Sequence, residues 1–348
     1  MSDDDATPRY NTASDLSSRP SDAVKPQGSD ILMPYEGVTP YEGLRLSGAM
    51  GHSFQLTQRI ESGAFGSIWV ASIVDGPLHD PARHDVVAVK ILDRPRPGAA
   101  ADEYRRSLDR GDYVVRGIDH SRPEDSIAFV AMRYVPGAHL SALVAAAKDQ
   151  GGHGVDGEKL PFLLEAFEVA LPCLYEFRGP RRERSYHGDI SPRNLVWHAP
   201  PGVDRGQFVI VDLGPGHGDE DSADVVPPMA RYVTPDMFPA VDQGVAPYPI
   251  YNDIHQAAQV ILYALTGEHP TSPHTTTPEE LEHLADLVPE GLPPELSQLL
   301  KDMLTPDPLE RSRRIPITEF GERMRAARLS LRSEDLRGPF STTAEEDR

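Results

Sequence analysis

The sequence has little of several features that mark other classes of protein. Cys173 is its only cysteine, which excludes an internal disulfide and a cysteine-based metal site. No stretch reaches about 18 consecutive apolar residues, so no transmembrane helix is expected. The first residues, Met-Ser-Asp-Asp-Asp, lack the basic and apolar regions of a signal peptide. We therefore expect a cytoplasmic protein.

Basic residues are also scarce relative to acidic ones. The 348-residue chain has 34 Lys and Arg against 54 Asp and Glu, a formal net charge of −20. An acidic chain is repelled by phosphate backbones and anionic lipids, so neither nucleic acid nor a membrane is expected as its main partner. A basic protein is the partner that this charge favours.

The order of strand-like and helix-like segments predicts an α+β fold. β-branched runs bounded by Gly and Pro predict strands at 54–60, 67–73, 86–92, 113–118 and 126–134, with one short helix at 99–108. Helical periodicity predicts later helices at 140–148, 160–177, 254–265, 278–287, 294–304 and 316–328. The chain thus changes from strand-rich to helix-rich along its length.

Composition and this change of pattern give the expected boundaries. Residues 1–52 are rich in Ser, Asp, Pro and Gly, which predicts a disordered or loosely attached leader. Residues 53–136 are expected to form a small strand-rich lobe, and residues 137–328 a mainly helical lobe. Residues 329–348 are predicted to be a polar tail.

Two loops in the helical part carry the residue types of a phosphate and magnesium site. The stretch 186–197 reads YHGDISPRNLVW, in which Asn194 follows Asp189 by five positions. The stretch 208–214, FVIVDLG, is an apolar strand that leads Asp212 into a glycine turn. Carboxylate and amide oxygens suit Mg²⁺, so a carboxylate base and two metal ligands are expected at one site.

These two loops resemble the catalytic and metal loops of the protein-kinase family. The resemblance implies a bilobal fold, with a small antiparallel sheet and one helix in the N-lobe and a mainly helical C-lobe. It implies that Asp189 accepts the proton of the acceptor hydroxyl, that Asn194 and Asp212 hold Mg²⁺, and that His187 is structural. Small-molecule kinases of the choline and aminoglycoside type share these loops, so the loops alone do not choose the substrate.

The strand-rich part supplies matching nucleotide elements. Residues 60–69, IESGAFGSIW, resemble the kinase glycine-rich loop, since a strand follows them rather than the helix of a Rossmann fingerprint. Lys90 matches the catalytic lysine that holds the α- and β-phosphates of ATP. The resemblance implies that the nucleotide contacts Ile60, Gly63, Phe65, Gly66, Ile68, Ala88, Lys90, Met132, Tyr134, Val135 and Val196.

In the family this lysine pairs with a glutamate on the next helix, and two acids of this chain compete for the role. Glu103 is the first candidate and Asp102 the second, although the stretch after Lys90 is shorter than the family pattern suggests. Either acid can equally be a solvated charge on a helix surface.

Three later segments distinguish protein kinases from small-molecule kinases. The segment that ends at Asp236 resembles the element that closes the activation segment. The helix near Asp253 resembles the one whose leading Asp braces the catalytic loop, and the segment that ends at Arg311 resembles the late helix whose Arg pairs with the closing acid. Taken singly, Asp253 is explained as a helix N-cap and Arg311 as a surface cation. Together they favour a protein kinase and predict a buried Asp236–Arg311 ion pair.

Four positions depart from the pattern of active kinases. Glu61 stands in place of the first glycine, and Gly188 in place of the catalytic-loop arginine. Ser191 replaces the lysine that contacts the transferred phosphate, and Met229 replaces the threonine that bonds that lysine. Such departures weaken contacts to the phosphate, and they leave a catalytically weak or inactive pseudokinase open.

The ligands for MgATP are nevertheless complete, because Lys90, Asp189, Asn194 and Asp212 are all present. The favoured hypothesis is a protein kinase that transfers the γ-phosphoryl group of ATP, with Mg²⁺, to Ser or Thr hydroxyls of a protein. A pseudokinase that binds nucleotide or a regulatory partner is the alternative. A small-molecule hydroxyl kinase is the third hypothesis, and Arg193, which resembles a tyrosine-kinase loop residue, keeps a tyrosine acceptor open.

Overall fold

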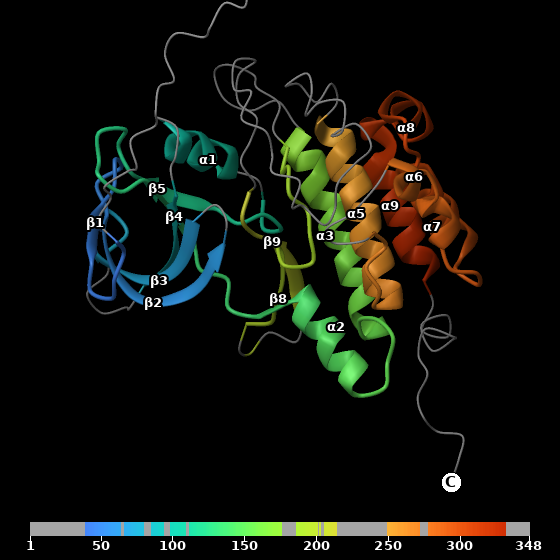
Figure 1. The fold of residues 1–348 in the computed structure, drawn as a ribbon, viewed down its shortest axis with the longest axis horizontal. Helices are drawn as coiled ribbons and strands as arrows, with labels where there is room; N and C mark the ends of the chain where they lie inside the picture. The colour runs from blue at the N-terminus through green and yellow to red at the C-terminus, as the bar shows by residue number, and fades with distance from the viewer. Residues whose placement is uncertain are drawn as a thin grey trace, which may run out of the picture. The chain divides into compact units, whose positions relative to one another are not determined.

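The fold is that of a computed structural model. The structure describes residues 39–63, 66–79, 85–93, 98–108, 111–175, 186–200, 202, 205–213, 249–271 and 278–331. All of these lie in one compact unit, residues 37–348. Along this unit a strand-rich part is followed by a helix-rich part, as Figure 1 shows.

The strand-rich part is a six-stranded antiparallel sheet in the order β1-β2-β3-β4-β6-β5. The strands are β1 (Arg45–Ser47), β2 (Ser53–Gly63), β3 (Gly66–Asp75), β4 (Val86–Leu92), β5 (Gly117–His120) and β6 (Phe129–Arg133). Alternate side chains of β3 are buried, as expected where β-branched and aromatic residues cover one face of a sheet. Helix α1 (Ala99–Ser107) packs against β5 and β6.

The sheet departs from the sequence prediction in two places. It begins earlier, because β1 lies within the range assigned to the leader; its Leu46 is buried and pairs with Phe54 of β2. The strand predicted at 113–118 is replaced by β5 at Gly117–His120. Its first residues pair elsewhere, since Val115 donates its N–H to the Ile210 carbonyl at 2.8 Å. A β-branched run alone does not say which sheet its backbone joins.

The helix-rich part carries a three-stranded sheet and a set of packed helices. The strands, in spatial order, are β7 (Ala138–His139), β8 (Leu195–His198) and β9 (Gln207–Ile210). The α-helices are α2 (Leu140–Asp149), α3 (Leu160–Tyr175), α5 (Pro249–Thr266), α6 (Pro278–Glu282), α7 (Pro294–Met303), α8 (Pro308–Arg314) and α9 (Ile317–Ser330). The short 3₁₀ helices are η1 (Gly157–Lys159) and η2 (Leu284–Leu287).

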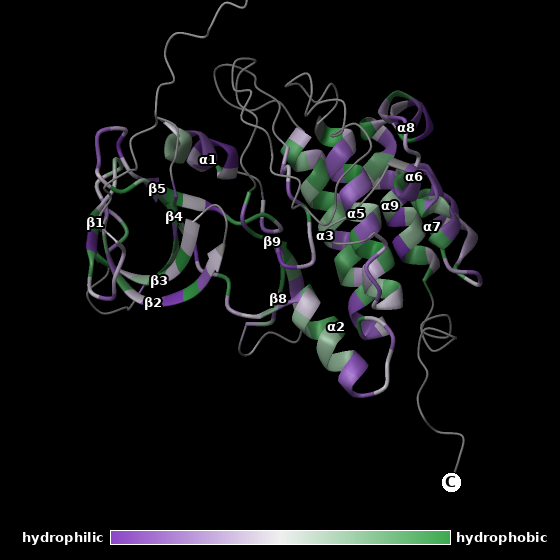
Figure 2. Ribbon diagram, viewed as in Figure 1, coloured by the Kyte–Doolittle hydropathy of each residue, from purple (hydrophilic) through white to green (hydrophobic). Residues whose placement is uncertain are grey.

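Helix α3 lies at the centre of this part and packs against α5, α9 and β9. Hydrophobic residues recur along α3 and α5, as the green segments of Figure 2 show. Leu163, Phe167 and Leu171, which follow one another at helical spacing on α3, are fully buried. Burying each such side chain stabilises the fold by roughly 1.5–3 kcal/mol, so this core supplies a firm base for the loops beside it.

The predicted helices are largely present, and the predicted α+β class is confirmed. Helix α5 begins at Pro249, before the predicted residue 254, and α9 runs past Arg328 to Ser330. Helix α8 was missed, because its seven residues are too few to show a period; Asp307 caps it by accepting the N–H of Leu309 at 2.9 Å. Among the described helices, none combines the length and apolar character needed to cross a bilayer.

Candidate active site

The loop formed by residues 186–194, here named the HGD loop, is held by helix α5. Asp253 accepts the backbone N–H of His187 at 2.6 Å and that of Gly188 at 2.8 Å. Gly188 has a φ of 82°, in the left-handed region that glycine adopts without strain. Burial raises the pKa of Asp253 to about 7, against the opposing effect of the two N–H groups. The resemblance to kinases implied this bracing role, and the structure places the Asp253 carboxylate under the loop.

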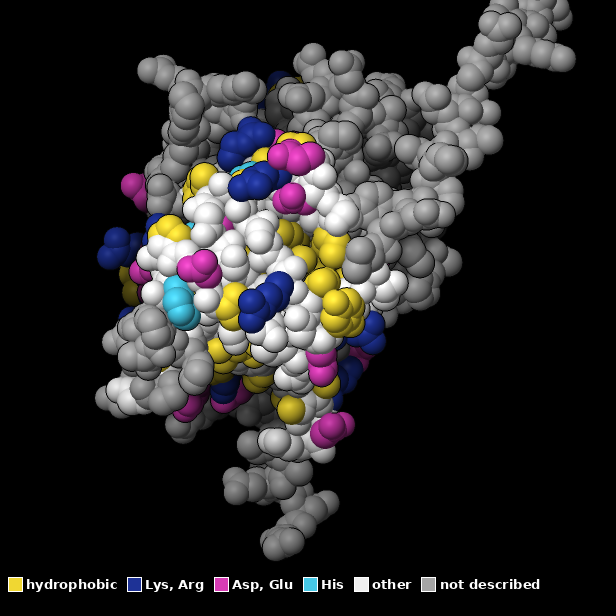
Figure 3. All heavy atoms as spheres, turned by 90° about the vertical axis from the view of Figure 1, so that its left-hand side faces the viewer, with side chains coloured by type: hydrophobic (Ala, Val, Ile, Leu, Met, Phe, Trp, Pro, Cys, Tyr) yellow, Lys and Arg dark blue, Asp and Glu magenta, His cyan; other side chains and the backbone are white. Residues whose placement is uncertain are grey.

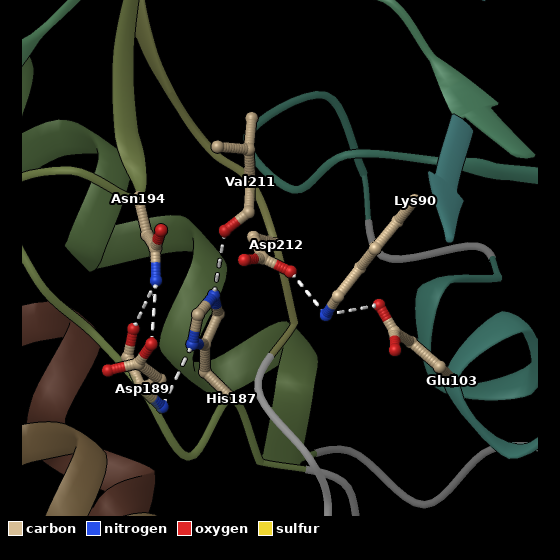
Figure 4. Close-up of polar contacts among 7 residues, drawn as sticks. All are labelled: Lys90, Glu103, His187, Asp189, Asn194, Val211 and Asp212. Carbon is tan, nitrogen blue, oxygen red and sulfur yellow. Dashed lines mark hydrogen bonds and ion pairs between the residues drawn. The ribbon is translucent and has the colours of Figure 1, made fainter. Parts of the chain in front are cut away.

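His187 connects the HGD loop with the strand that leads to Asp212. Its Nε2 lies 3.1 Å from the Val211 carbonyl oxygen, and its Nδ1 accepts the N–H of Asp189 at 3.2 Å (Figure 4). Since Nδ1 accepts, Nε2 must carry the proton and donate it. Burial lowers the pKa of His187 to about 4, which keeps the ring neutral and this tautomer fixed near pH 7.

Asp189 and Asn194 meet at the end of the HGD loop. The Asn194 Nδ2 donates to the Asp189 backbone oxygen at 2.8 Å and to its Oδ2 at 3.1 Å. Burial, and then the neighbouring charge of Asp212, raise the pKa of Asp189 to about 6, while Asn194 and Lys90 act in the opposite direction. A carboxylate with a pKa just below neutrality is ionised at pH 7 and is suited to accept a proton.

Lys90 lies between two carboxylates that come from distant parts of the chain. Its Nζ lies 3.0 Å from Glu103 Oε1 on α1 and 2.5 Å from Asp212 Oδ1, as Figure 4 shows. Burial alone would lower the pKa of Lys90, but the charges of Asp212 and Glu103 outweigh it and raise that pKa well above its usual range. Burial also raises the pKa of Glu103, and the charge of Lys90 opposes this rise. The cluster therefore holds a charged lysine in a desolvated place.

The structure resolves which acid pairs with the lysine. Glu103 turns into the site, and its side chain is 7% exposed. Asp102, the second candidate, forms an ion pair with Arg105 on a more exposed face of α1. The neighbouring positions on a helix point in different directions, so only one of the two acids can reach Lys90.

Asp212 has an unusual backbone. Its φ of 55° is positive, and it is the one non-glycine residue with a positive φ in the described ranges. The left-handed region costs most residues roughly 1–2 kcal/mol, although Asp enters it more readily than most, and such conformations recur at functional sites. It aims the carboxylate back from the end of the Val211 segment toward Lys90.

The donor chemistry of the site fits Mg²⁺ with a nucleotide. Asn194 uses its amide nitrogen on Asp189, which leaves its carbonyl oxygen as the end for a cation, and Asp212 uses one oxygen on Lys90. Within the described ranges, no group of three or more His, Cys, Asp or Glu side chains forms a metal site by itself. Mg²⁺ commonly takes only one or two carboxylates and completes its shell with water and phosphate oxygens, so this small donor set suffices.

Gly66, the first residue of β3, comes close to β4. Gly63 pairs with Gly66, whose φ is 143°, and a Cβ on Gly66 would lie 1.9 Å from the Ile91 carbonyl oxygen. Only glycine fits there. Ile68 lies opposite Lys90 across the β3–β4 pair, while Ile60 on β2 is 45% exposed. Phe65, also predicted to contact nucleotide, lies outside the described residues.

The other predicted nucleotide residues lie where β4, β6 and β8 approach the connection between the two parts. Ala88 lies opposite Met132, and both belong with Val135 to one apolar cluster. Tyr134, next to Val135, is half-buried. Val196 on β8 is buried, and it lies so close to Gly137 that a Cβ there would come within 2.9 Å of its Cγ1. Ala88, Met132 and Val135 are thus brought together, with Val196 beside the nearby Gly137, and the contact of these residues with nucleotide stays a prediction.

Arg311 is fully buried rather than a surface cation. Its guanidinium donates to the carbonyls of Thr305 at 2.7 Å, Tyr251 at 2.7 Å and Pro306 at 2.9 Å. It therefore ties α8 to the start of α5. Its predicted partner, Asp236, lies outside the described residues, so that ion pair stays a prediction.

Two further contacts join the HGD loop to residues that the sequence analysis did not link with it. Gln256 Oε1 accepts the N–H of Ile190 at 3.1 Å, from the helical turn after Asp253. Arg193 Nη1 lies 3.9 Å from Glu61 Oε1 near the end of β2, and both side chains are well exposed. The spacing of Gln256 from Asp253 could have signalled the first contact, whereas nothing local links Glu61 with Arg193.

The face of the molecule on the strand-rich side carries mixed charges. On the part of this face that the structure describes, Lys and Arg side chains alternate with Asp and Glu, and apolar side chains lie between them (Figure 3). Neither sign gathers into a continuous patch on this described part of the face.

Comparison with known proteins relates the chain to solved kinase structures. A scan against protein-family models and a search of the curated proteins found no match. The PknI kinase domain of Mycobacterium tuberculosis superposes with a TM-score of 0.53 at 18% identity, covering 83% of this chain and 100% of that chain. Two mutant forms of that domain are also 18% identical to this chain. The double mutant gives a TM-score of 0.52 and covers 84% of this chain and 100% of its own. The single mutant gives a TM-score of 0.51 and covers 83% of this chain and 99% of its own. The similarity at this identity is one of fold.

Proposed function

With a protein-kinase fold as the premise, we propose that this chain is an ATP-dependent protein kinase. It transfers the γ-phosphoryl group of MgATP to a Ser or Thr hydroxyl of a protein substrate. The proposal rests on the contacts of the buried Lys90 with the buried Glu103 and with Asp212, which bring together β4, α1 and the segment after β9. Asp189 lies near enough for the charge of Asp212 to raise its pKa.

Different residues bind the nucleotide with Mg²⁺ and accept the proton. Lys90, held by Glu103, offers a fixed positive charge to the phosphates of the nucleotide. Asp212 and Asn194 are the residues that would hold Mg²⁺, which neutralises phosphate charge when bound. Asp212 contacts Lys90 through Oδ1, which leaves Oδ2 for a cation. Asn194 contacts Asp189 through its amide nitrogen, which leaves its carbonyl oxygen for a cation.

Asp189 acts on the acceptor hydroxyl. Its carboxylate accepts the proton as the oxygen attacks the γ-phosphorus, and Asn194 fixes the direction of that carboxylate. The N–H of Asp189 is bound to His187, so its backbone is fixed as well. The transfer is accelerated mainly by positioning of the reactants and by neutralisation of phosphate charge. The protein need not bond covalently to the phosphoryl group during its transfer.

A pseudokinase is the second candidate, and two observations favour it. Ser191 stands where the family pattern has a cation, and Glu61 brings an acid to the glycine turn. Glu61 also lies 3.9 Å from Arg193, a cation of the HGD loop. Met229, another of the four departures, lies outside the described residues. A protein of this kind would bind nucleotide, or a basic partner, and transfer little phosphate.

The test is transfer of labelled γ-phosphate from MgATP to the purified full chain and to a basic acceptor protein. Asp189→Asn serves as the control, since it keeps the shape of the side chain and removes the base. Label that falls by about 100-fold or more in the control supports the kinase, and phosphoamino-acid analysis then separates Ser and Thr from Tyr. Equal label in both proteins would overturn the role of Asp189, and label on choline or an aminoglycoside in a substrate panel would favour a small-molecule kinase.

A further inference from the structure

Four successive backbone N–H groups of the HGD loop are bound by side chains. Asp253 accepts those of His187 and Gly188, and His187 itself accepts that of Asp189. The fourth, that of Ile190, is accepted by Gln256 Oε1 at 3.1 Å. Asp189 therefore lies between two residues whose backbones are both fixed from helix α5.

Gln256 makes this contact in a place that water does not reach. Its side chain is fully buried, as is that of Ile190. It follows Asp253 by three positions, which puts both side chains on one face of α5, toward the loop. Because the Ile190 N–H can only donate, the oxygen end of the Gln256 amide must face it. The contact therefore has a defined direction.

The loop needs an anchor on the far side of Asp189. Gly188, just before Asp189, has a positive φ and no side chain to restrict it. Asp253 holds the loop only up to Gly188. His187 and Asn194 also hold Asp189, at its N–H and its carbonyl oxygen, but both residues belong to the loop itself. The Gln256 contact adds a tie to α5 beyond Gly188, and without it the segment from Asp189 to Ile190 can turn about the glycine and take the carboxylate from its place beside Asn194.

We propose that Gln256 is a positioning residue that acts through Ile190 to hold Asp189 in its reactive orientation. The inference rests on the proposed phosphotransfer for its consequence on rate, but not for its consequence on the loop. Asp253 and Gln256 then form a two-point support, with one point on each side of the base.

The test compares two variants of the full chain that differ by one helical turn. Gln256→Met keeps the length of the side chain and removes the acceptor. Gln259→Met is the matched control, because Gln259 is also fully buried on α5 and its Nε2 lies 2.9 Å from Nδ1 of His255 on the same helix. Thermal melts report the general cost of each change. Hydrogen exchange of the peptide that covers residues 187–194 reports the loop, and steady-state kinetics report transfer.

Gln256→Met is expected to speed amide exchange in this peptide by about tenfold or more. It should lower kcat by about 10- to 100-fold and leave the KM for ATP within about twofold, since only the orientation of the base has changed. Gln259→Met should leave loop exchange and kcat near the wild-type values. If Gln256→Met does not fold, Gln256→Asn, which withdraws the amide by one methylene, is measured in its place.

Unchanged loop exchange in the Gln256 variant, or equal effects on exchange and kcat in both variants, would overturn the positioning role. If the wild-type protein transfers no phosphate, the proposed function is what has failed. Faster loop exchange in the Gln256 variant alone would then still support Gln256 as the anchor of the loop, and unchanged exchange would overturn it.

Discussion

Replacing Lys90 with methionine removes the cation that lies between Glu103 and Asp212. The Lys90 and Glu103 side chains are both 7% exposed, whereas that of Asp212 is 28% exposed. Removing one partner of a buried ion pair commonly costs about 3–5 kcal/mol. The lower end applies here, because Asp212 is partly hydrated and burial already raises the pKa of Glu103 toward protonation. We expect Lys90→Met to lower the free energy of unfolding by about 3 kcal/mol at pH 7.

A second substitution shows whether unpaired charge causes this loss. Lys90→Met with Glu103→Gln leaves no ionised residue at position 103, so about 1–2 kcal/mol of stability should return. Lowering the pH should also help the single variant. With a folded-state pKa above its unfolded value, Glu103 destabilises the native state as the pH rises, and this penalty fades as the pH falls and the carboxyl protonates.

Urea unfolding followed by circular dichroism measures these differences, with the wild type, both single variants and the double variant at pH 5 and pH 7. The reasoning is refuted if Lys90→Met stays within about 0.5 kcal/mol of the wild type at pH 7. It is refuted as well if the double variant is no more stable than Lys90→Met, since the loss would then not come from the unpaired acid.

Three further predictions concern single positions. Gly66→Ala places a Cβ 1.9 Å from the Ile91 carbonyl oxygen, so we expect it to lower the free energy of unfolding by about 2 kcal/mol or more, measured by thermal unfolding. Gly43→Ala is the control, because Gly43 also has a positive φ but a Cβ there meets no atom within 4 Å. Gly188→Ala keeps 3.4 Å from the nearest atom and should cost only about 1 kcal/mol, so a collapse of the fold would contradict this. His187, with its pKa lowered to about 4 from 6.5, binds a proton more readily when unfolded; stability should fall by up to about 3 kcal/mol as the pH drops from 6.5 to 4. His187→Asn should lack this component in urea unfolding at pH 5 and pH 7, and an unchanged acid sensitivity would speak against it.

The sequence could predict those parts of the site that short, local patterns encode. Asp189 and Asn194 share one loop, and Asp212 ends an apolar strand, so their residue types and spacing point to a common site without knowledge of the fold. The main helices are predictable for the same reason, because their apolar periodicity extends over several turns. The α+β class follows from the order of these patterns.

Contacts between distant segments could not be predicted in this way. The backbone of Val115 joins Ile210 rather than extending β5, and nothing in a β-branched run specifies that partner. The choice of Glu103 over Asp102 depends on how α1 is rotated against the sheet. The spacing of Gln256 from Asp253 places both on one face of α5, but which group the buried Gln256 amide binds depends on the fold of the loop beside it.

Lys90, Asn194 and Asp212 are proposed to belong to one MgATP site. Calorimetric titration of ATP into the wild type and into Asp212→Asn, each with and without Mg²⁺, tests it most directly. The wild type should bind ATP at least about tenfold more tightly with Mg²⁺, a gain of roughly 1.4 kcal/mol, and Asp212→Asn should lose that gain while it still binds ATP through Lys90. No binding at millimolar ATP, or an equal gain from Mg²⁺ in both proteins, would contradict the claim.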